Sequence, residues 1–224
     1  MTLDFESFTL AAATADLDEE PAAREHADCV EFRMDLADEP LDALGAYDGD
    51  LPLLVTNRPE WEGGEAEPSG RIDTLETAIE HEAVAAVDIE LATLSGGEGH
   101  DLVERAAELG VSVVVSTHDF EETPPRPELG RLLTRAGGVG DVAKLAVTAE
   151  NPDDCLDLLA ATRAHAAEGA TVATMAMGEV GKHTRAVAPV YGSKIGYAPV
   201  DPAEATAPGQ YDLATLRSLV EGLS

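Results

Sequence analysis

Apolar runs typical of β-strands recur along the chain, and segments with helical spacing separate them. Eight strands are predicted, in the order Phe8–Ala13, Cys29–Asp35, Pro52–Asn57, Ala86–Leu91, Ser112–Thr117, Val142–Val147, Thr171–Met177 and Gly192–Gly196. Four segments repeat apolar residues at steps of three and four, which predicts helices over Ile72–Ala83, Asp101–Leu109, Cys155–Ala167 and Leu213–Leu223. Weaker helical patterns occupy Glu20–His26, Leu41–Tyr47, Glu128–Ala136 and Lys182–Ala186.

The ends of the stronger helices carry capping signals. Asp101 and Asn151 suit amino-terminal ends, and Gly110 and Gly169 suit carboxyl-terminal ends. Strands that alternate with helices indicate a parallel sheet covered by helices. The prediction is an α/β fold, a single (β/α)8 TIM barrel formed by residues 1–224. An open doubly wound sheet is the alternative, but such sheets usually have a glycine-rich turn after the first strand, and Ala11–Ala15 contains no glycine.

Charged side chains occupy alternate positions near the carboxyl ends of several predicted strands. They are Glu31, Arg33, Asp35, Arg58, Asp88, Glu90, His118 and Lys144. Strands of a covered parallel sheet are normally apolar throughout, and an unpaired buried charge is costly. Because alternate side chains share a face, these groups can point into the mouth of the barrel, where barrel enzymes place their active sites. Internal ion pairs or solvent-exposed strand ends are the alternative interpretation.

Lysine is rare in this chain, which contains only Lys144, Lys182 and Lys194. Lys144 lies within an apolar strand. Apolar walls and neighbouring cations make a lysine amine more available in its neutral form, and such an amine forms an imine with a carbonyl compound. We therefore predict that Lys144 is a covalent catalyst. The alternative is a structural ion pair with Asp119 or Glu90.

The acidic composition narrows the class of partner. The formal net charge is −30, and the acidic residues are spread along the chain between apolar segments. A surface of this kind keeps a protein soluble in concentrated salt, so a halophilic protein is predicted. The same charge argues against nucleic acid or an anionic membrane as a partner. A disordered acidic tail is the alternative, but it would need the acids to form a block.

Three further features predict a cytoplasmic protein without metal or cofactor. No apolar run approaches the roughly 20 residues that span a bilayer. The segment Met1–Leu10 has no basic residue of the kind that begins a signal peptide. Cys29 and Cys155 are isolated, and the histidines lack the spacing of a metal site.

Seven motifs, in order, resemble those of the type I 3-dehydroquinate dehydratases, also called 3-dehydroquinases. They are Glu31–Asp35 (EFRMD), Arg58–Gly64 (RPEWEGG), Asp88–Leu91 (DIEL), Ser116–Phe120 (STHDF), Asp141–Ala146 (DVAKLA), Met177–Arg185 (MGEVGKHTR) and Ala207–Gln210 (APGQ). Each motif alone is weak evidence. Together they run from about residue 8 to residue 210, and each falls on the predicted rim, which makes the resemblance specific.

The resemblance implies a lyase of the shikimate pathway that converts 3-dehydroquinate to 3-dehydroshikimate and water without a cofactor. Lys144 would attack the C3 ketone and form a protonated imine. His118 would remove a proton from C2 and later protonate the departing C1 hydroxyl. Glu62 would orient His118 and favour its charged form.

The resemblance also implies how the substrate is held. Arg185 would bind the substrate carboxylate, and Thr206 and Gln210 would close over that end. The residues expected to bind the ring hydroxyls or to position one another are Glu31, Arg33 and Arg58. The family further suggests a homodimer.

Three departures from the family pattern concern loop geometry and substrate affinity rather than the reaction. Pro59 replaces a small hydroxyl residue, and Thr184 and Thr206 stand where serine is commoner. Two other functions stay open. One is a different Schiff-base barrel lyase, of the class I aldolase type, with Gly192–Lys194 as part of a phosphate site. The other is a non-catalytic acidic binding domain.

Overall fold

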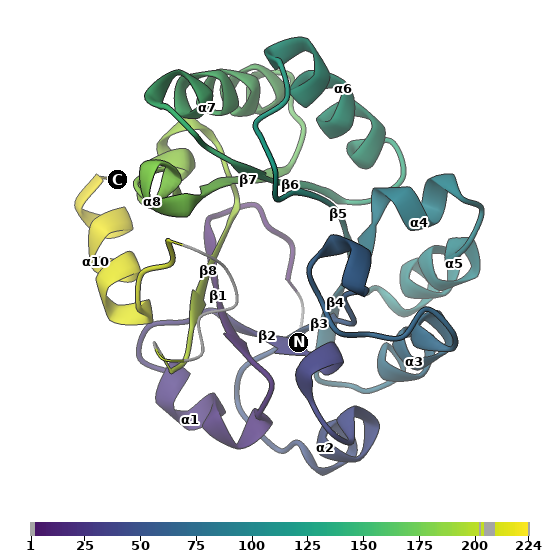
Figure 1. Ribbon diagram of the computed structural model, residues 1–224. Coiled ribbons are helices and arrows are strands. Elements are labelled where there is room, and N and C mark those ends of the chain that lie inside the picture. Colours follow the sequence, from purple (N-terminus) through teal and green to yellow (C-terminus); the bar gives the residue numbers. More distant parts are fainter. Residues whose placement is uncertain (1–2, 202, 204–208, 224) are drawn as a thin grey trace.

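The computed structural model describes residues 3–201, 203 and 209–223. Within these residues eight parallel strands form a central ring with helices outside it, so the predicted (β/α)8 TIM barrel is confirmed (Figure 1). The strands are β1 (Thr9–Thr14), β2 (Cys29–Arg33), β3 (Leu53–Thr56), β4 (Val84–Glu90), β5 (Ser112–Asp119), β6 (Val142–Thr148), β7 (Val172–Met177) and β8 (Ile195–Pro199). The longer helices are α2 (Pro40–Ala46), α3 (Arg71–Ala78), α5 (His100–Leu109), α6 (Arg126–Gly137), α7 (Pro152–Ala167) and α10 (Leu213–Leu223).

Single helical turns complete the connections between these elements. The α-helical turns are α1 (Glu20–Ala23), α4 (Leu91–Ser95), α8 (Gly178–Gly181) and α9 (Thr184–Val187). The 3-10 turns are η1 (Leu17–Glu19), η2 (Met34–Leu36), η3 (Glu60–Glu62) and η4 (Ala188–Tyr191). No helix of the described part of the chain is long and apolar enough to cross a membrane.

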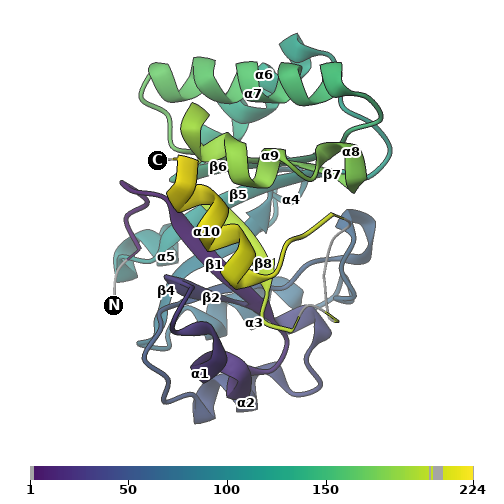
Figure 2. The same cartoon turned by 90° about the vertical axis from the view of Figure 1, so that its left-hand side faces the viewer.

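The ring of strands is weakest between β7 and β8. Every other neighbouring pair forms a parallel ladder, whereas β7 and β8 meet at a bridge between Val172 and Ser193. The backbone N–H of Lys194 donates to the Val172 carbonyl at 2.7 Å. Helix α10 lies across β1 and β8 (Figure 2), where Leu216 packs with Leu10. The last helix therefore covers the side of the barrel next to this seam.

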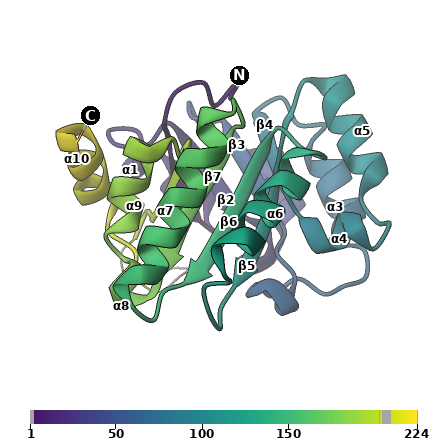
Figure 3. The same ribbon diagram turned by 90° about the horizontal axis from the view of Figure 1, so that it is seen from above.

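Alternate positions of each strand face the helices or the barrel interior. On β2, Val30 and Phe32 pack in the layer beneath the helices, and Cys29 packs in the interior with Ala11 and Leu54. Figure 3 shows α6 and α7 covering β6 and β7 in the same outer layer. Apolar side chains fill much of the barrel interior. The buried charged groups lie instead at the carboxyl ends of the strands.

Three of the four predicted helix ends match the structure closely, and one is wrong. Gly169, with a left-handed φ of 90°, follows the C-cap Glu168 at the end of α7. Asn151 caps α7 through a capping box with Asp154, and Gly110 ends α5 with a left-handed φ of 73°. Asp101 was expected to begin its helix, but α5 begins one residue earlier, with Gly99 at the cap. The last strand was also misplaced, since β8 begins at Ile195.

Salt dependence of stability follows from where the acidic residues lie. Only five acidic residues of the described part are buried: Glu20, Glu31, Glu62, Asp88 and Glu90. The side chain of Asp35 is also inaccessible and is paired with Arg33. Most of the other described acids face or approach solvent, and their mutual repulsion destabilises the compact state in dilute buffer. The Debye length falls to about 3 Å at 1 M salt, so this repulsion is then screened.

We predict that the Tm rises between 0.1 and 2 M sodium chloride, by about 2–4 °C for each kcal/mol of repulsion removed. Calorimetry or circular dichroism measures it. Potassium chloride should act equally, because screening depends on ionic strength. A Tm that stays flat or falls over this range would refute a stability limited by surface charge.

Candidate active site

A cavity opens at the carboxyl ends of the strands and gathers most of the predicted site residues. Its walls are formed by Glu31, Arg33, Thr56, Arg58, Glu62, Gly63, His118, Phe120, Lys144, Ala146, Met175, Met177, Arg185, Tyr197 and Gln210. Eight of the nine residues predicted from the sequence are in this set. The ninth, Thr206, lies outside the described residues.

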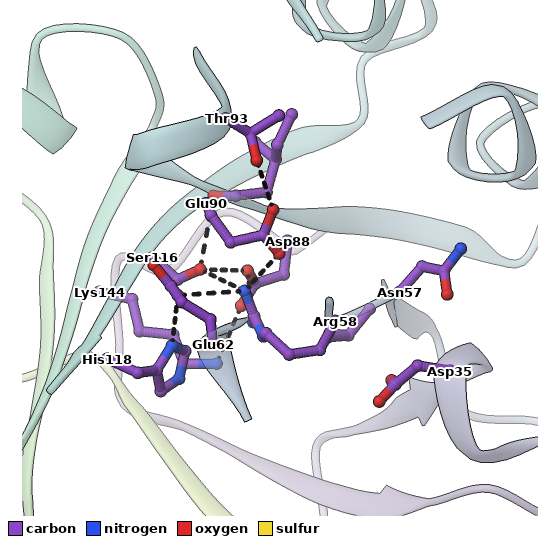
Figure 4. Close-up of polar contacts among 12 residues, drawn as sticks. Asp35, Asn57, Arg58, Glu62, Asp88, Glu90, Thr93, Ser116, His118 and Lys144 are labelled. Atoms are coloured by element: carbon purple, nitrogen blue, oxygen red, sulfur yellow. Dashed lines mark hydrogen bonds and ion pairs between the residues drawn. The ribbon is translucent and has the colours of Figure 1, made fainter. Parts of the chain in front are cut away.

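The Arg58 guanidinium is the centre of a buried ion cluster (Figure 4). Its Nη2 atom lies 2.7 Å from Asp88 Oδ1, and its Nη1 atom lies 2.7 Å from both Glu90 Oε1 and Ser116 Oγ. The side chain of Arg58 is only 4% exposed. A charge this far from water is tolerated only when it is paired and hydrogen-bonded, and Arg58 meets both conditions.

A second arginine, absent from the sequence prediction, supports this cluster from outside. Arg71 Nη2 lies 2.6 Å from Glu90 Oε2 and donates to Thr93 Oγ1 at 2.5 Å. The Asn57 amide donates to the Arg71 carbonyl at 3.2 Å. Glu90 is thus held between two guanidinium groups, which fixes the position of Arg58.

Lys144 is tied to the same cluster through Asp88. Its Nζ atom donates to Asp88 Oδ2 at 2.9 Å and lies 3.7 Å from Glu31 Oε1, which accepts from Thr56 Oγ1. Although burial opposes ionisation, Arg58 and Lys144 hold the pKa of Asp88 well below its usual range. The sequence suggested cations around Lys144. Carboxylates contact it instead.

His118 lies on β5 beside Lys144 on β6, one inward-facing position nearer the mouth, because Ser116 pairs with Lys144. Its Nδ1 atom is 2.8 Å from Glu62 Oε2, and its ring stacks on Phe120 with centroids 5.9 Å apart. The sequence therefore identified the correct partner for His118.

The charge state of this pair differs from the expectation. Burial raises the pKa of Glu62 to about 8, partly offset by Arg58. Burial, together with Arg58 and Lys144, lowers the pKa of His118 well below its ordinary value. Glu62 was expected to favour charged His118. The structure favours the neutral imidazole instead, because burial and the nearby cations outweigh a carboxyl group whose own pKa is raised.

Arg185 approaches the cavity from α9, on the side of β7 and β8. Thr184 positions this turn, because its Oγ1 atom donates to the Gly181 carbonyl at 2.7 Å and accepts from the Ala176 N–H at 2.8 Å. Burial lowers the pKa of Arg185 to about 10. A desolvated guanidinium that lines a cavity is suited to bind an anion.

Comparison with known proteins agrees with this geometry. The sequence profile of the type I 3-dehydroquinase family matches residues 7–223. The chain belongs to this family. It is 65% identical to the 3-dehydroquinate dehydratase of Haloarcula marismortui over 97% of both chains, and 51% identical to that of Halobacterium salinarum over 99% and 100%. These relatives come from halophilic archaea, in agreement with the acidic surface.

Solved structures of family members have the same fold. A type I 3-dehydroquinate dehydratase from Clostridium difficile, described with covalently modified comenic acid, superposes with a TM-score of 0.87 at 28% identity, covering 97% of this chain and 92% of that one. The 3-dehydroquinate dehydratase of Geobacillus kaustophilus gives 0.85 at 29% identity, covering 97% and 91%. The coverage includes the whole barrel.

Two departures from the type I 3-dehydroquinase pattern now have a structural reading. Thr184 keeps the hydroxyl that ties α9 to β7. The carbonyl of Pro59 accepts from the N–H groups of Glu62 and Gly64, at 3.1 and 3.0 Å. The loop that carries Glu62 is therefore held by its own backbone, without a hydroxyl at position 59.

The proposed phosphate site of an aldolase-type lyase is not at the cavity. Ser193 and Lys194 precede β8, at the opposite end of the barrel from the mouth. Lys194 Nζ donates to the Glu6 carbonyl, and Ser193 Oγ accepts from the Thr174 N–H. Among the described residues, no group of three histidine, cysteine, aspartate or glutamate side chains is arranged to hold a metal ion.

The Glu62–His118 pair predicts a change of imidazole tautomer with pH. Below about pH 8 Glu62 is protonated and donates to Nδ1, so the ring proton is on Nε2. Above it, the ionised carboxylate accepts from Nδ1–H and leaves Nε2 able to take a proton.

Long-range proton–nitrogen NMR of the His118 ring should show this exchange, with a midpoint near pH 8. Glu62→Gln should abolish the pH dependence, because the amide does not titrate. A ring protonated on both nitrogens at pH 7, or one tautomer from pH 6.5 to 9, would contradict this account of the pair.

Proposed function

We propose that this protein catalyses the dehydration of 3-dehydroquinate to 3-dehydroshikimate in the shikimate pathway, through an imine on Lys144. The observation that carries the proposal is that Lys144 and His118, on the adjacent strands β6 and β5, line one cavity together with Glu62 from η3. The names of the family and of the curated relatives support the same substrate.

The first step is attack of the Lys144 amine on the C3 ketone. The ammonium must first lose a proton. Asp88 is a poor proton acceptor because its pKa is low. The proton is therefore assigned to Glu31, whose Oε1 atom lies 3.7 Å from Lys144 Nζ. The Nζ–C3 bond then forms and the C3–O bond breaks. The former ketone oxygen leaves as water, with the proton held by Glu31 and one of the two protons of the attacking amine. The nitrogen of the resulting iminium is again positive, so its attraction to Asp88 is restored.

The second step is elimination across C1 and C2. A proton on C2 is far more acidic beside an iminium than beside a ketone, because the nitrogen accepts the electron pair. His118 acts as the neutral tautomer whose proton is on Nδ1, against the ionised Glu62 carboxylate, a form that predominates above about pH 8. Its free Nε2 takes the C2 proton and gives it to the C1 hydroxyl, which leaves as water. Hydrolysis of the imine releases 3-dehydroshikimate and restores Lys144.

Binding of the substrate carboxylate is assigned to Arg185, with Gln210 on the same side of the cavity. The buried guanidinium has lost hydration, and a carboxylate replaces it with two parallel charge-assisted hydrogen bonds. Removing one partner of such a pair typically costs about 2–5 kcal/mol. Arg33, which forms a bidentate pair with Asp35, and Arg58 position the neighbouring carboxylates.

The activity is tested by incubating the protein with 3-dehydroquinate and following the absorbance of the conjugated enone product. Lys144→Met, which keeps the length of the side chain but has no amine, should reduce the rate to the background of the assay. Lys194→Met is the matched control, because Lys194 lies at the other end of the barrel. If the unaltered protein forms no enone, the proposed activity is wrong and the non-catalytic binding domain is favoured. If Lys144→Met turns over at the normal rate, the imine mechanism is wrong.

The order of the two steps predicts a separable effect at His118. His118→Ala should still form the imine but lose elimination by roughly two to four orders of magnitude, the usual contribution of a general base. Borohydride reduction in the presence of 3-dehydroquinate, followed by intact-mass measurement, should show a stoichiometric adduct. Turnover close to that of the unaltered enzyme would remove His118 from the mechanism.

A further inference from the structure

Tyr197 lines the cavity and has no part in the roles assigned so far. It lies on β8 beside Ala11 of β1 and is 4% exposed. Its side chain packs in the barrel interior with Ala11, Cys29 and Met175, and the small size of Ala11 and Cys29 leaves room for a large ring. The ring is thus placed next to the reacting lysine by residues that are themselves apolar.

The ring of Tyr197 lies under the Lys144 nitrogen. The distance from Nζ to the ring centroid is 4.2 Å, well within the range in which an aromatic face attracts a cation. The attraction holds for the ammonium and for the iminium, since both carry the positive charge at this nitrogen. It is absent for the neutral carbinolamine, so the ring favours completion of the imine.

The hydroxyl of Tyr197 is also unusual for a buried group. Among the described residues it has no hydrogen-bond partner. Other inaccessible hydroxyls of this chain have one: Ser116 Oγ donates to Asp88 at 2.6 Å, and Thr162 Oγ1 lies 2.6 Å from Thr174 Oγ1. An unsatisfied buried hydroxyl destabilises the protein, so its presence in a residue that lines the cavity points to a ligand.

We propose that Tyr197 is a further residue of the reaction, whose ring stabilises the cationic imine on Lys144 and whose hydroxyl hydrogen-bonds to a polar group of the bound substrate. This inference rests on the imine mechanism proposed above. Burial raises the pKa of Tyr197 well above its ordinary value, so the hydroxyl stays protonated and acts as a hydrogen-bond donor rather than an acid.

The test uses full-length His118→Ala protein, in which imine formation is separated from elimination. Two quantities are measured by intact mass: the substrate concentration that gives half-maximal borohydride trapping, and the trapping rate at saturating substrate, which is proportional to the share of the adduct present as iminium rather than carbinolamine. Four versions of position 197 are compared: tyrosine, phenylalanine, pentafluorophenylalanine and leucine. The fluorinated ring keeps the shape but reverses the charge distribution of the aromatic face, so it isolates the cation–ring attraction even if Tyr197→Leu folds poorly.

Phenylalanine should raise the half-trapping concentration by about two- to tenfold, through loss of one hydrogen bond. Leucine and pentafluorophenylalanine should lower the trapping rate at saturating substrate by roughly three- to thirtyfold relative to phenylalanine, because the iminium loses the attraction and the neutral carbinolamine has none to lose. The ligand-free Tyr197→Phe protein should melt no lower than its parent, because an unsatisfied hydroxyl has been removed. Tyr191→Phe, at an exposed tyrosine, is the matched control and should change none of these quantities.

Each part of the proposal has its own contrary result. Equal trapping rates at saturating substrate with phenylalanine and pentafluorophenylalanine at position 197 would overturn the role of the ring. Unchanged trapping by Tyr197→Phe, or a Tm that falls by several degrees, would overturn the role of the hydroxyl. If the His118→Ala parent gives no adduct at any substrate concentration, the imine mechanism itself fails and this inference fails with it. If the His118→Ala parent is trapped normally and the substitutions at position 197 do not change trapping, only the inference about Tyr197 is rejected.

Discussion

The ion pair between Arg58 and Asp88, shared with Lys144, is the interaction on which the mouth of this barrel depends. Burying so many charges is tolerated only if nearly every one is paired with a group of opposite charge. The described cluster contains four cations, Arg33, Arg58, Arg71 and Lys144, and five acids, Glu31, Asp35, Glu62, Asp88 and Glu90. Since burial keeps Glu62 protonated up to about pH 8, the ionised groups balance.

This balance constrains the chemistry as well as the stability. Lys144 carries a positive charge as an ammonium and again as an iminium, so Asp88 keeps an opposite charge at 2.9 Å at both ends of the step. Arg58 prevents Asp88 from becoming the proton acceptor, and the same cation helps keep His118 neutral. A neutral imidazole is the form that removes a proton. One guanidinium therefore acts on the carboxylate that contacts Lys144 and on the imidazole of His118.

Much of this site could be predicted from the sequence because its charges interrupt apolar strands at alternate positions. Glu31, Asp88 and Lys144 follow this rule, and strand alternation places them in the interior. Arg71 and Thr93 could not be found in this way, because they come from α3 and α4, where no alternation distinguishes a buried polar residue.

Tyr197 was missed for a different reason. Strand β8 contains Gly196 and Pro199, residues that are uncommon in strands, so the pattern placed the strand three residues too early and left Tyr197 outside it. The protonation of the His118–Glu62 pair could not be predicted from the sequence either, because it depends on burial and on cations contributed by other parts of the barrel.

The most direct test is a crystal structure of the enzyme reduced with borohydride in the presence of 3-dehydroquinate. The account predicts continuous density from Lys144 Nζ to C3 of the ring, the carboxylate on Arg185, and Asp88 still beside the nitrogen. It also predicts His118 Nε2 facing C2. An adduct on Lys182 or Lys194, or an unmodified Lys144 in fully active crystals, would contradict it.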